Sequence, residues 1–345
     1  MKVKKKRVYC TFYDAPEHTF PGHPESPQRF QSLKDWVNSP PFPEIQWLNF
    51  KPATTKDVNL AHDPAHLADL QEECKQGRHE FESAPTYVTE QSCEAALMAV
   101  GATLAVSRKI LAMKTGCGFA IVRPPGHHAE LRESMGFCLL NNIAIAVADA
   151  IQRGVGKVAI IDFDAHHANG TQAIFWNTDQ VGLLSIQEED IYPGTGKITA
   201  VTHARGRIIS IPLPAFSGNS AYLSLMERIV KPWLIEFAPE MIFVSAGFDA
   251  HFSDPLTTIT LDTESFYQMT RTLVQLADEL CQGRLMYVLE GGYDPVALAD
   301  NIAACLAAMC GHQYQQDHFG KSLSLAIDIS ERVQQVIRLH RIQEI

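Results

Sequence analysis

Short apolar runs that alternate with helical segments constrain the fold of this chain more than any other feature. Stretches 89–113, 220–237 and 263–281 repeat apolar residues at helical spacing. The runs around them are apolar apart from single serines and are typical of buried strands: residues 119–122, 158–161, 181–186, 208–211, 241–245 and 285–289. Strands of this kind lie in parallel sheets covered by helices. The pattern predicts an α/β fold with a central, mostly parallel sheet and helices on both faces.

The charge and the cysteines of the chain narrow the classes of function and partner. The net charge is -10, and we expect no nucleic-acid partner because phosphate contacts need a basic surface. We also expect no membrane partner, since no stretch approaches the apolar length of a membrane span and the start is too polar for a signal peptide. The eight cysteines form no Cys-x-x-Cys pair, which is typical of reduced thiols in a cytoplasmic protein.

The polar residues that follow three of the predicted strands suggest a metal site. Asp164 and His166 follow run 158–161, two residues apart, and point to one side in extended geometry. Asp249 follows run 241–245, and Tyr293 follows run 285–289 behind two glycines. Singly, these segments could be solvated loops, helix caps or turns. Together, at the carboxyl edge where parallel sheets bind ligands, they predict an Asp/His/Asp site with an open position, typical of catalytic zinc.

Two adjacent histidines, His127 and His128, follow run 119–122. Paired histidines can be a surface accident or part of a metal site. Here Asp162 and Asn169 flank the proposed ligands and offer each imidazole an acceptor. A carboxylate behind one ring raises its basicity, and an amide behind the other orients it with less charge support. The arrangement predicts two histidines of different pKa, suited to acid and base roles.

The chain carries five ordered motifs: Pro124-Pro125-Gly126-His127-His128, Gly136-Phe137-Cys138-Leu139-Leu140-Asn141-Asn142, Asp162-Phe163-Asp164-Ala165-His166-His167-Ala168-Asn169-Gly170-Thr171-Gln172, Gly247-Phe248-Asp249-Ala250 and Glu290-Gly291-Gly292-Tyr293. These motifs are similar to those of the zinc-dependent histone deacetylases, a superfamily that includes bacterial histone-deacetylase-like amidohydrolases and acetylpolyamine amidohydrolases. The early segment 22–29 also resembles that family, and the likeness runs from about residue 18 to about residue 310. With Asn169 at a position where class I members usually carry aspartate, the chain resembles class II members.

The resemblance implies an arginase-like single domain, here residues 1–345, and a reaction that hydrolyses N-acyl amides. It implies one Zn²⁺ bound by Asp164, His166 and Asp249, although the same ligands would accept ferrous iron. His127 backed by Asp162, and His128 backed by Asn169, would be the acid/base pair, with His128 the main general base. Tyr293 would donate its hydroxyl to the developing oxyanion. The residues implied for a structural monovalent cation, K⁺, are Asp162, Asp164, His166, Ser185 and Ile186.

The resemblance also implies a narrow substrate channel. Phe137 and Tyr192 would sandwich an alkyl chain, and Gly136 would offer its carbonyl to the substrate N–H. Leu256 stands where a polyamine-specific relative has a glutamate, which favours acyl-lysine-like substrates over acetylpolyamines. The aspartate that holds the substrate backbone in many members has no clear counterpart; Ser83 is near its place. Three functions stay open: a lysine deacetylase, a deacylase of acetylpolyamines or other small amines, and an inactive relative that binds acylated ligands. A homo-oligomer is also possible from the sequence.

Overall fold

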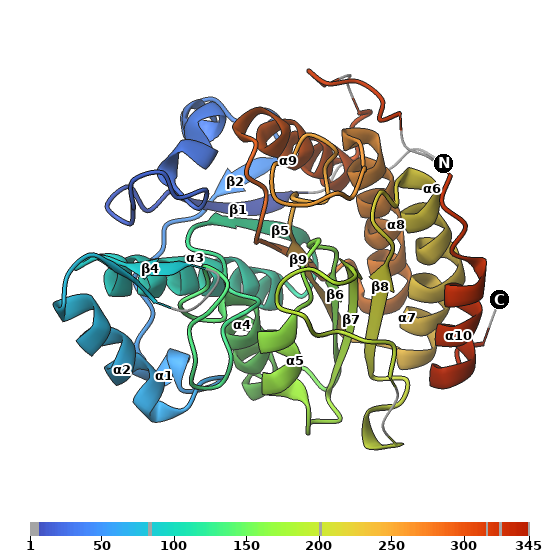
Figure 1. The fold of residues 1–345 in the computed structure, drawn as a ribbon, viewed down its shortest axis with the longest axis horizontal. Coiled ribbons are helices and arrows are strands. Elements are labelled where there is room, and N and C mark those ends of the chain that lie inside the picture. Colours follow the sequence, from blue (N-terminus) through green and yellow to red (C-terminus); the bar gives the residue numbers. More distant parts are fainter. Residues whose placement is uncertain (1–6, 82–84, 200–201, 315–316, 324–325, 344–345) are drawn as a thin grey trace.

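An eight-stranded sheet forms the centre of the computed structural model, which describes residues 7–81, 85–199, 202–314, 317–323 and 326–343 (Figure 1). Its strand order is β2-β1-β5-β10-β9-β6-β7-β8, and all its neighbouring strands run parallel. The strands are β1 (Val8–Tyr13), β2 (Ile45–Trp47), β5 (Cys117–Val122), β6 (Val158–Asp162), β7 (Val181–Glu188), β8 (Ile208–Leu213), β9 (Met241–Ala246) and β10 (Leu285–Leu289). A separate antiparallel pair joins β3 (His79–Phe81) and β4 (Thr86–Val88). The predicted mostly parallel sheet is confirmed.

Helices cover both faces of this sheet, as predicted (Figure 1). On one side lie α1 (Thr55–Val58), α2 (Pro64–Lys75), α3 (Ser92–Met113), α4 (Asn142–Gln152) and α5 (Asn169–Phe175). On the other lie η1 (Pro27–Val37), α6 (Asn219–Leu225), η3 (Met226–Val230), α7 (Lys231–Phe237), α8 (Thr263–Cys281), α9 (Pro295–Cys310) and α10 (Ser330–His340). The short turn η2 (Thr202–Ala204) precedes β8. The predicted helix 220–237 is thus α6 and α7 joined by one π-helical turn.

The strands divide their side chains between two cores. In β6, Val158 and Ile160 belong to the core beneath α3 and α4, whereas Ala159 and Ile161 belong to the core beneath α8 and α9. This alternation follows from the two-residue period of a strand. It also explains why the central strands are mostly apolar: both of their faces are buried. The eight cysteines are free, and all but Cys93 are buried.

One expectation about the helices was wrong. Helix α3 has 22 residues and is long and apolar enough to span a membrane, although we expected no such stretch. In its most apolar window, 56% of the residues are buried, and the helix packs on β1, β5 and α4. Core helices of this kind pass the same length and composition test, so α3 is explained by its place in the core.

The strand order determines where the functional residues lie. Strands β5, β10, β9 and β6 are consecutive neighbours and all point the same way. The loops that follow them therefore leave the same edge of the sheet, side by side. The loop after β5 carries His127 and His128, and the loop after β10 carries Tyr293. The loop after β9 carries Asp249, and the loop after β6 carries Asp164 and His166.

Candidate active site

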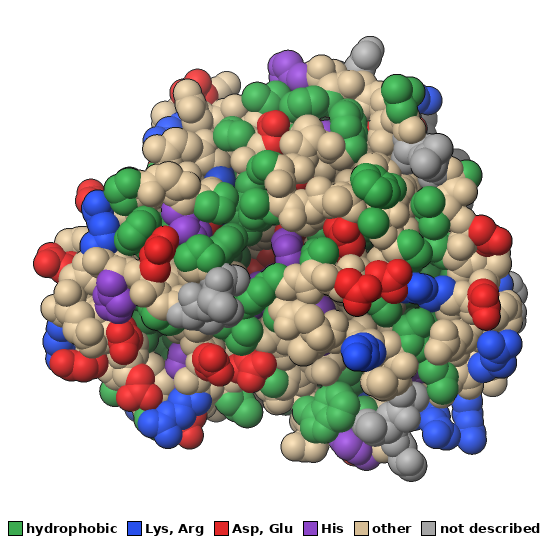
Figure 2. Space-filling model, viewed as in Figure 1, with side chains coloured by type: hydrophobic (Ala, Val, Ile, Leu, Met, Phe, Trp, Pro, Cys, Tyr) green, Lys and Arg blue, Asp and Glu red, His purple; other side chains and the backbone are tan. Residues whose placement is uncertain are grey.

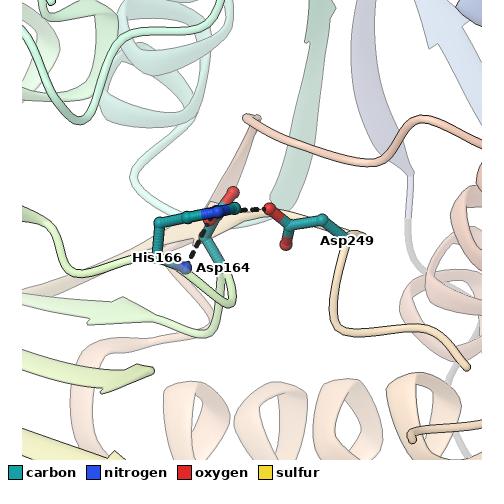
Figure 3. A group of neighbouring side chains, drawn as sticks. All are labelled: Asp164, His166 and Asp249. Carbon is teal, nitrogen blue, oxygen red and sulfur yellow. Dashed lines mark hydrogen bonds and ion pairs between the residues drawn. The ribbon is translucent and has the colours of Figure 1, made fainter. Parts of the chain in front are cut away.

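Asp164, His166 and Asp249 come together at the carboxyl edge of the sheet, as Figure 3 shows. One potential ligand atom from each lies within 4.8 Å of the others. His166 Nδ1 is 2.8 Å from Asp249 Oδ2 and 3.1 Å from Asp164 Oδ1. The first two residues leave β6 and the third leaves its neighbour β9. These are the three residues that the sequence predicts as metal ligands.

Backbone amides hold the two carboxylates in place. Gly291 N–H donates to Asp164 Oδ2 and Ala165 N–H donates to Asp249 Oδ1, both at 2.9 Å. Gly247 and Gly291 allow this close packing: a Cβ at Gly247 would lie 2.0 Å from Asp164 Oδ2, and one at Gly291 would lie 2.5 Å from Asp249 Oδ2. The glycines are therefore required for space beside the carboxylates.

The charges of this cluster fit a divalent cation. Burial would lower the pKa of His166, but hydrogen bonds to Asp164 and Asp249 and their charges raise it well above its usual value. A single ring N–H thus faces oxygens of two buried carboxylates. A dication in place of this proton would interact with the ring nitrogen and with both carboxylates at once. The set of one imidazole nitrogen and two carboxylate oxygens suits zinc, with a position left open, and suits ferrous iron as well.

The histidine pair lies beside this cluster, with the predicted partners. His127 Nδ1 is 2.9 Å from Asp162 Oδ2, and His128 Nδ1 is 2.6 Å from Asn169 Oδ1. Burial alone would lower the pKa of His127, but the charges of Asp164 and Asp162 raise it to about 10. Burial and the neighbouring His127 lower the pKa of His128 well below its usual value. The rings are 4.0 Å apart between centroids. The pKa values of the two imidazoles are therefore shifted in opposite directions.

A pocket opens from these groups toward the surface. It is lined by Pro125, His127, His128, Gly136, Phe137, Cys138, Asp164, His166, Tyr192, Leu256, Gly291 and Tyr293. Figure 2 shows histidine side chains recessed among hydrophobic ones near the centre of this face. The ring of Tyr192 meets His128 edge-on at 5.1 Å, and Phe137 meets Tyr293 edge-on at 5.9 Å. The four predicted channel residues thus line one pocket with the histidine pair and Tyr293.

Gly136 and Phe137 have backbone conformations that the sequence does not reveal. Both lie in the left-handed region, with φ of +55° and +68°. A Cβ at Gly136 would lie 2.4 Å from the His128 ring and 2.8 Å from the Tyr192 ring. Only glycine leaves room for the backbone between these rings. For Phe137 this conformation is strained, and such strain is typical of functional sites.

A buried charged network behind the pocket was not predicted. Arg29 donates from Nε to Gly292 O at 2.7 Å and from Nη2 to Glu290 O at 2.6 Å, and its guanidinium lies 4.8 Å from the centroid of the Tyr293 ring. Glu290 in turn accepts from the backbone N–H groups of Gly126 at 2.7 Å and His127 at 3.1 Å. Arg29 and Glu290 therefore hold the loops that carry Tyr293 and the histidine pair.

A second part of this network lies deeper. Arg123 and Glu25 form a fully buried pair, with Nε 2.6 Å from Oε1 and Nη2 2.8 Å from Oε2. Asp254 accepts from the backbone N–H of Tyr293 at 2.7 Å, and burial, followed by the charge of Asp249, raises the pKa of Asp254 to about 8. Each of these residues supports a loop without lining the pocket.

The residues suggested for a monovalent cation lie next to the cluster. Asp162 and Ser185 are paired across β6 and β7, and Ile186 follows in β7. The oxygens of Asp162 already accept from His127 Nδ1 and from Asp164 N, and Ser185 Oγ donates to Gln187 Oε1 at 2.9 Å. A potassium ion here stays a prediction. Ser83 lies outside the described residues.

Comparison with known proteins identifies relatives of the whole chain. The histone deacetylase domain family matches residues 23–309. Histone deacetylase 14, chloroplastic, of Arabidopsis thaliana is 34% identical over 93% of this chain and 81% of its own length. A histone deacetylase-like amidohydrolase of Pseudomonas aeruginosa is 36% identical over 79% of this chain and 73% of its own length. The crystal structure of the HDA15 HD domain superposes with a TM-score of 0.85 at 28% identity, covering 98% of this chain and 94% of that one.

Proposed function

This chain belongs to the histone deacetylase family, and we propose that it is a zinc-dependent deacetylase of lysine side chains or similar acylated amines. The observation that carries the proposal is that Asp164 and His166 line one pocket with the histidine pair and form a cluster of three potential ligands with Asp249. An inactive relative that only binds acylated ligands is disfavoured, because each group that the reaction requires is present and faces the same space.

Asp164, His166 and Asp249 would hold the metal ion. When bound, a divalent ion would supply Lewis-acid polarisation of the substrate carbonyl and of a water molecule. The backbone amides of Gly291 and Ala165 each hold one oxygen of these carboxylates, Asp164 Oδ2 and Asp249 Oδ1. The protein thus fixes the ligands before the ion arrives, which reduces reorganisation during turnover.

His128 would accept the proton of the attacking water. Its ring is neutral because its pKa is low, and its Nδ1 is held by Asn169, so Nε2 is free to act as the base. His127 is held between Asp162 and Asp164 and stays charged, with Nε2 3.7 Å from Asp164 Oδ1. The proton that His128 takes would then be available to the leaving amine.

Tyr293 and Gly136 would orient the amide. The Tyr293 hydroxyl would donate to the carbonyl oxygen as negative charge develops there. Burial raises the pKa of Tyr293 well above its usual value, so the hydroxyl keeps its proton at neutral pH. The Gly136 carbonyl would accept the substrate N–H, while Phe137 and Tyr192 would contact the alkyl chain of the substrate.

The rim of the pocket favours an uncharged region of the substrate. Leu256 lines the pocket and is 39% exposed, and leucine offers no charge to a distal ammonium. We therefore place acyl-lysine-like substrates before acetylpolyamines. Class II membership through Asn169, a structural K⁺, a cytoplasmic location, one domain over 1–345, the absence of membrane and nucleic-acid partners, and a possible homo-oligomer stay predictions.

A substrate panel tests the proposal. Zinc-loaded protein is assayed on an acetyl-lysine peptide, on longer acyl-lysine peptides, and on acetylated putrescine and spermidine. We expect turnover of at least one acyl-lysine peptide above that of the polyamines. Faster turnover of acetylpolyamines would favour small-amine deacylation as the function. Absence of turnover of every amide by protein with stoichiometric zinc would refute the proposed enzymatic activity.

A further inference from the structure

The two acceptors behind the histidine pair differ in one respect that the reaction depends on. The carboxylate of Asp162 offers His127 two equivalent oxygens, whereas the amide of Asn169 has an accepting end and a donating end. With Oδ1 toward His128 Nδ1, the neutral ring keeps its proton on Nδ1 and leaves Nε2 as a base. With the amide reversed, the proton would sit on Nε2 and the base would be lost. The orientation of one amide therefore decides whether His128 can act.

Glu130 is the strongest of the groups that fix this amide. Asn169 Nδ2 donates to Glu130 Oε1 at 2.9 Å; the other acceptors are Met135 Sδ at 3.2 Å and His128 O at 3.4 Å. The carboxylate is the only charged group of the three, and charge-assisted bonds are about twice as strong as neutral ones. A thioether is a weak acceptor. Reversal would turn the amide oxygen toward all three acceptors, with the largest repulsion from Glu130.

The position of Glu130 is set by its own loop. Its backbone N–H donates to Glu133 O at 2.9 Å, and its carbonyl accepts from His62 Nδ1 at 2.8 Å. Glu130 does not line the substrate pocket; it lines a separate hollow with His167, Asn169, Gln172, Ala173, Trp176 and Thr195. Asn169 lies between that hollow and His128. The side chain of Glu130 is thus linked to His128 by hydrogen bonds through the amide of Asn169.

We propose that Glu130 is a positioning residue whose carboxylate fixes the amide of Asn169 and thereby the tautomer of His128. The inference rests on the proposed deacylation. An aspartate at position 169 would bring a negative charge directly behind His128. The carboxylate of Glu130 brings the same charge one hydrogen bond further from the ring. It thus supports the positive charge that His128 acquires when it accepts a proton.

Steady-state kinetics on an acetyl-lysine peptide test this role. The zinc-loaded wild type is compared with Glu130→Ala, Asn169→Asp and their double variant, and with the two further variants Glu130→Gln and Glu133→Ala. Loss of such outer partners typically costs about 10- to 100-fold in activity, and we expect Glu130→Ala to lower kcat on that scale with KM little changed. Glu130→Gln keeps an acceptor for Asn169 Nδ2 and is expected to retain more of kcat. Glu133→Ala removes an exposed carboxylate from the same loop and is the matched control, expected to match the wild type.

The sign of the effect should reverse in the Asn169→Asp background. An aspartate at position 169 has two equivalent oxygens, so the acceptor behind His128 needs no orientation. Its carboxylate would also repel Glu130, because the wild-type Asn169 Nδ2 is only 2.9 Å from Glu130 Oε1. Glu130→Ala is then expected to raise kcat or leave it unchanged. Equal losses of kcat on Glu130→Ala in both backgrounds, or an equally large loss of kcat in Glu133→Ala, would overturn the proposal. General damage to the loop would produce either result.

A spectroscopic measurement separates this proposal from the proposed function. The ¹⁵N shifts of the His128 ring distinguish Nδ1–H from Nε2–H and require no turnover. We expect the Nδ1–H tautomer in the wild type and in Glu133→Ala, and a mixture of both in Glu130→Ala. A pure Nδ1–H tautomer in Glu130→Ala would refute the role of Glu130 even in a fully active enzyme, and the expected mixture would support it in a chain without deacylase activity.

Discussion

Removal of the Tyr293 hydroxyl by Tyr293→Phe separates catalysis from binding. The phenylalanine ring keeps the contacts that hold residue 293: the edge-on contact with Phe137 at 5.9 Å, the Arg29 guanidinium 4.8 Å from the ring centroid, and the backbone bond to Asp254 at 2.7 Å. Loss of one oxyanion donor typically costs about 100- to 1000-fold in kcat, or about 2.7–4 kcal/mol of transition-state stabilisation. We expect a decrease of that size in kcat, with KM, zinc content and the unfolding midpoint close to the wild type.

The assay measures kcat and KM on an acetyl-lysine peptide, with zinc determined by elemental analysis in the same samples. Tyr267→Phe is the matched control, because its hydroxyl also makes a hydrogen bond, to His312 O at 2.9 Å, but lies away from the pocket. The control should lose about 1 kcal/mol of stability and no kcat. Full activity of zinc-loaded Tyr293→Phe would refute the role of this hydroxyl.

Three further outcomes follow from the geometry of the site and its support. Asp249→Ala removes one of three ligands and is expected to abolish zinc binding; stoichiometric zinc by elemental analysis would show that the ligand set is wrong. Zinc affinity should rise with pH by about tenfold per unit for each proton released, because the raised pKa of His166 keeps the metal-free ring protonated at neutral pH; a competition titration that gives equal affinity at low and neutral pH would contradict this. Glu25→Gln leaves Arg123 buried without its counter-charge and should lower the free energy of unfolding by about 3–5 kcal/mol, measured in urea. Burial opposes ionisation of Glu25, but Arg123 lowers its pKa to about 2, so this stability is present above the usual carboxyl pKa and is lost as the pH falls toward 2. An unchanged urea midpoint in Glu25→Gln would count against the pair as a source of stability.

The central strands were predictable because burial on both faces makes them mostly apolar. Strands β1 and β2 were not, since Val8–Tyr13 includes a threonine and two tyrosines, and Ile45–Trp47 has only three residues with an exposed glutamine. Helix α3 shows the opposite difficulty. Its apolar sequence is compatible with a membrane or with a protein core, and only the contacts with β1, β5 and α4 identify the core.

The groups at the strand ends were predictable because parallel strands bring their following loops together. Their supporting network was not. Arg123 and Glu25 are separated by 98 residues, and Arg29 and Gly292 by 263, so no local spacing relates them. The amide orientation of Asn169 is a further example. It depends on Glu130, 39 residues earlier, and a pattern of residue types cannot express which end of an amide faces a histidine.

Zinc titration of metal-stripped protein tests the central claim most directly. Acetate release from an acetyl-lysine peptide is measured as zinc is added back to a known concentration of chain. If Asp164, His166 and Asp249 hold the catalytic ion, activity is absent in the stripped protein, rises linearly and stops rising at one zinc per chain. Deacetylation that persists in stripped protein, or that stays absent at one bound zinc per chain, would contradict the account.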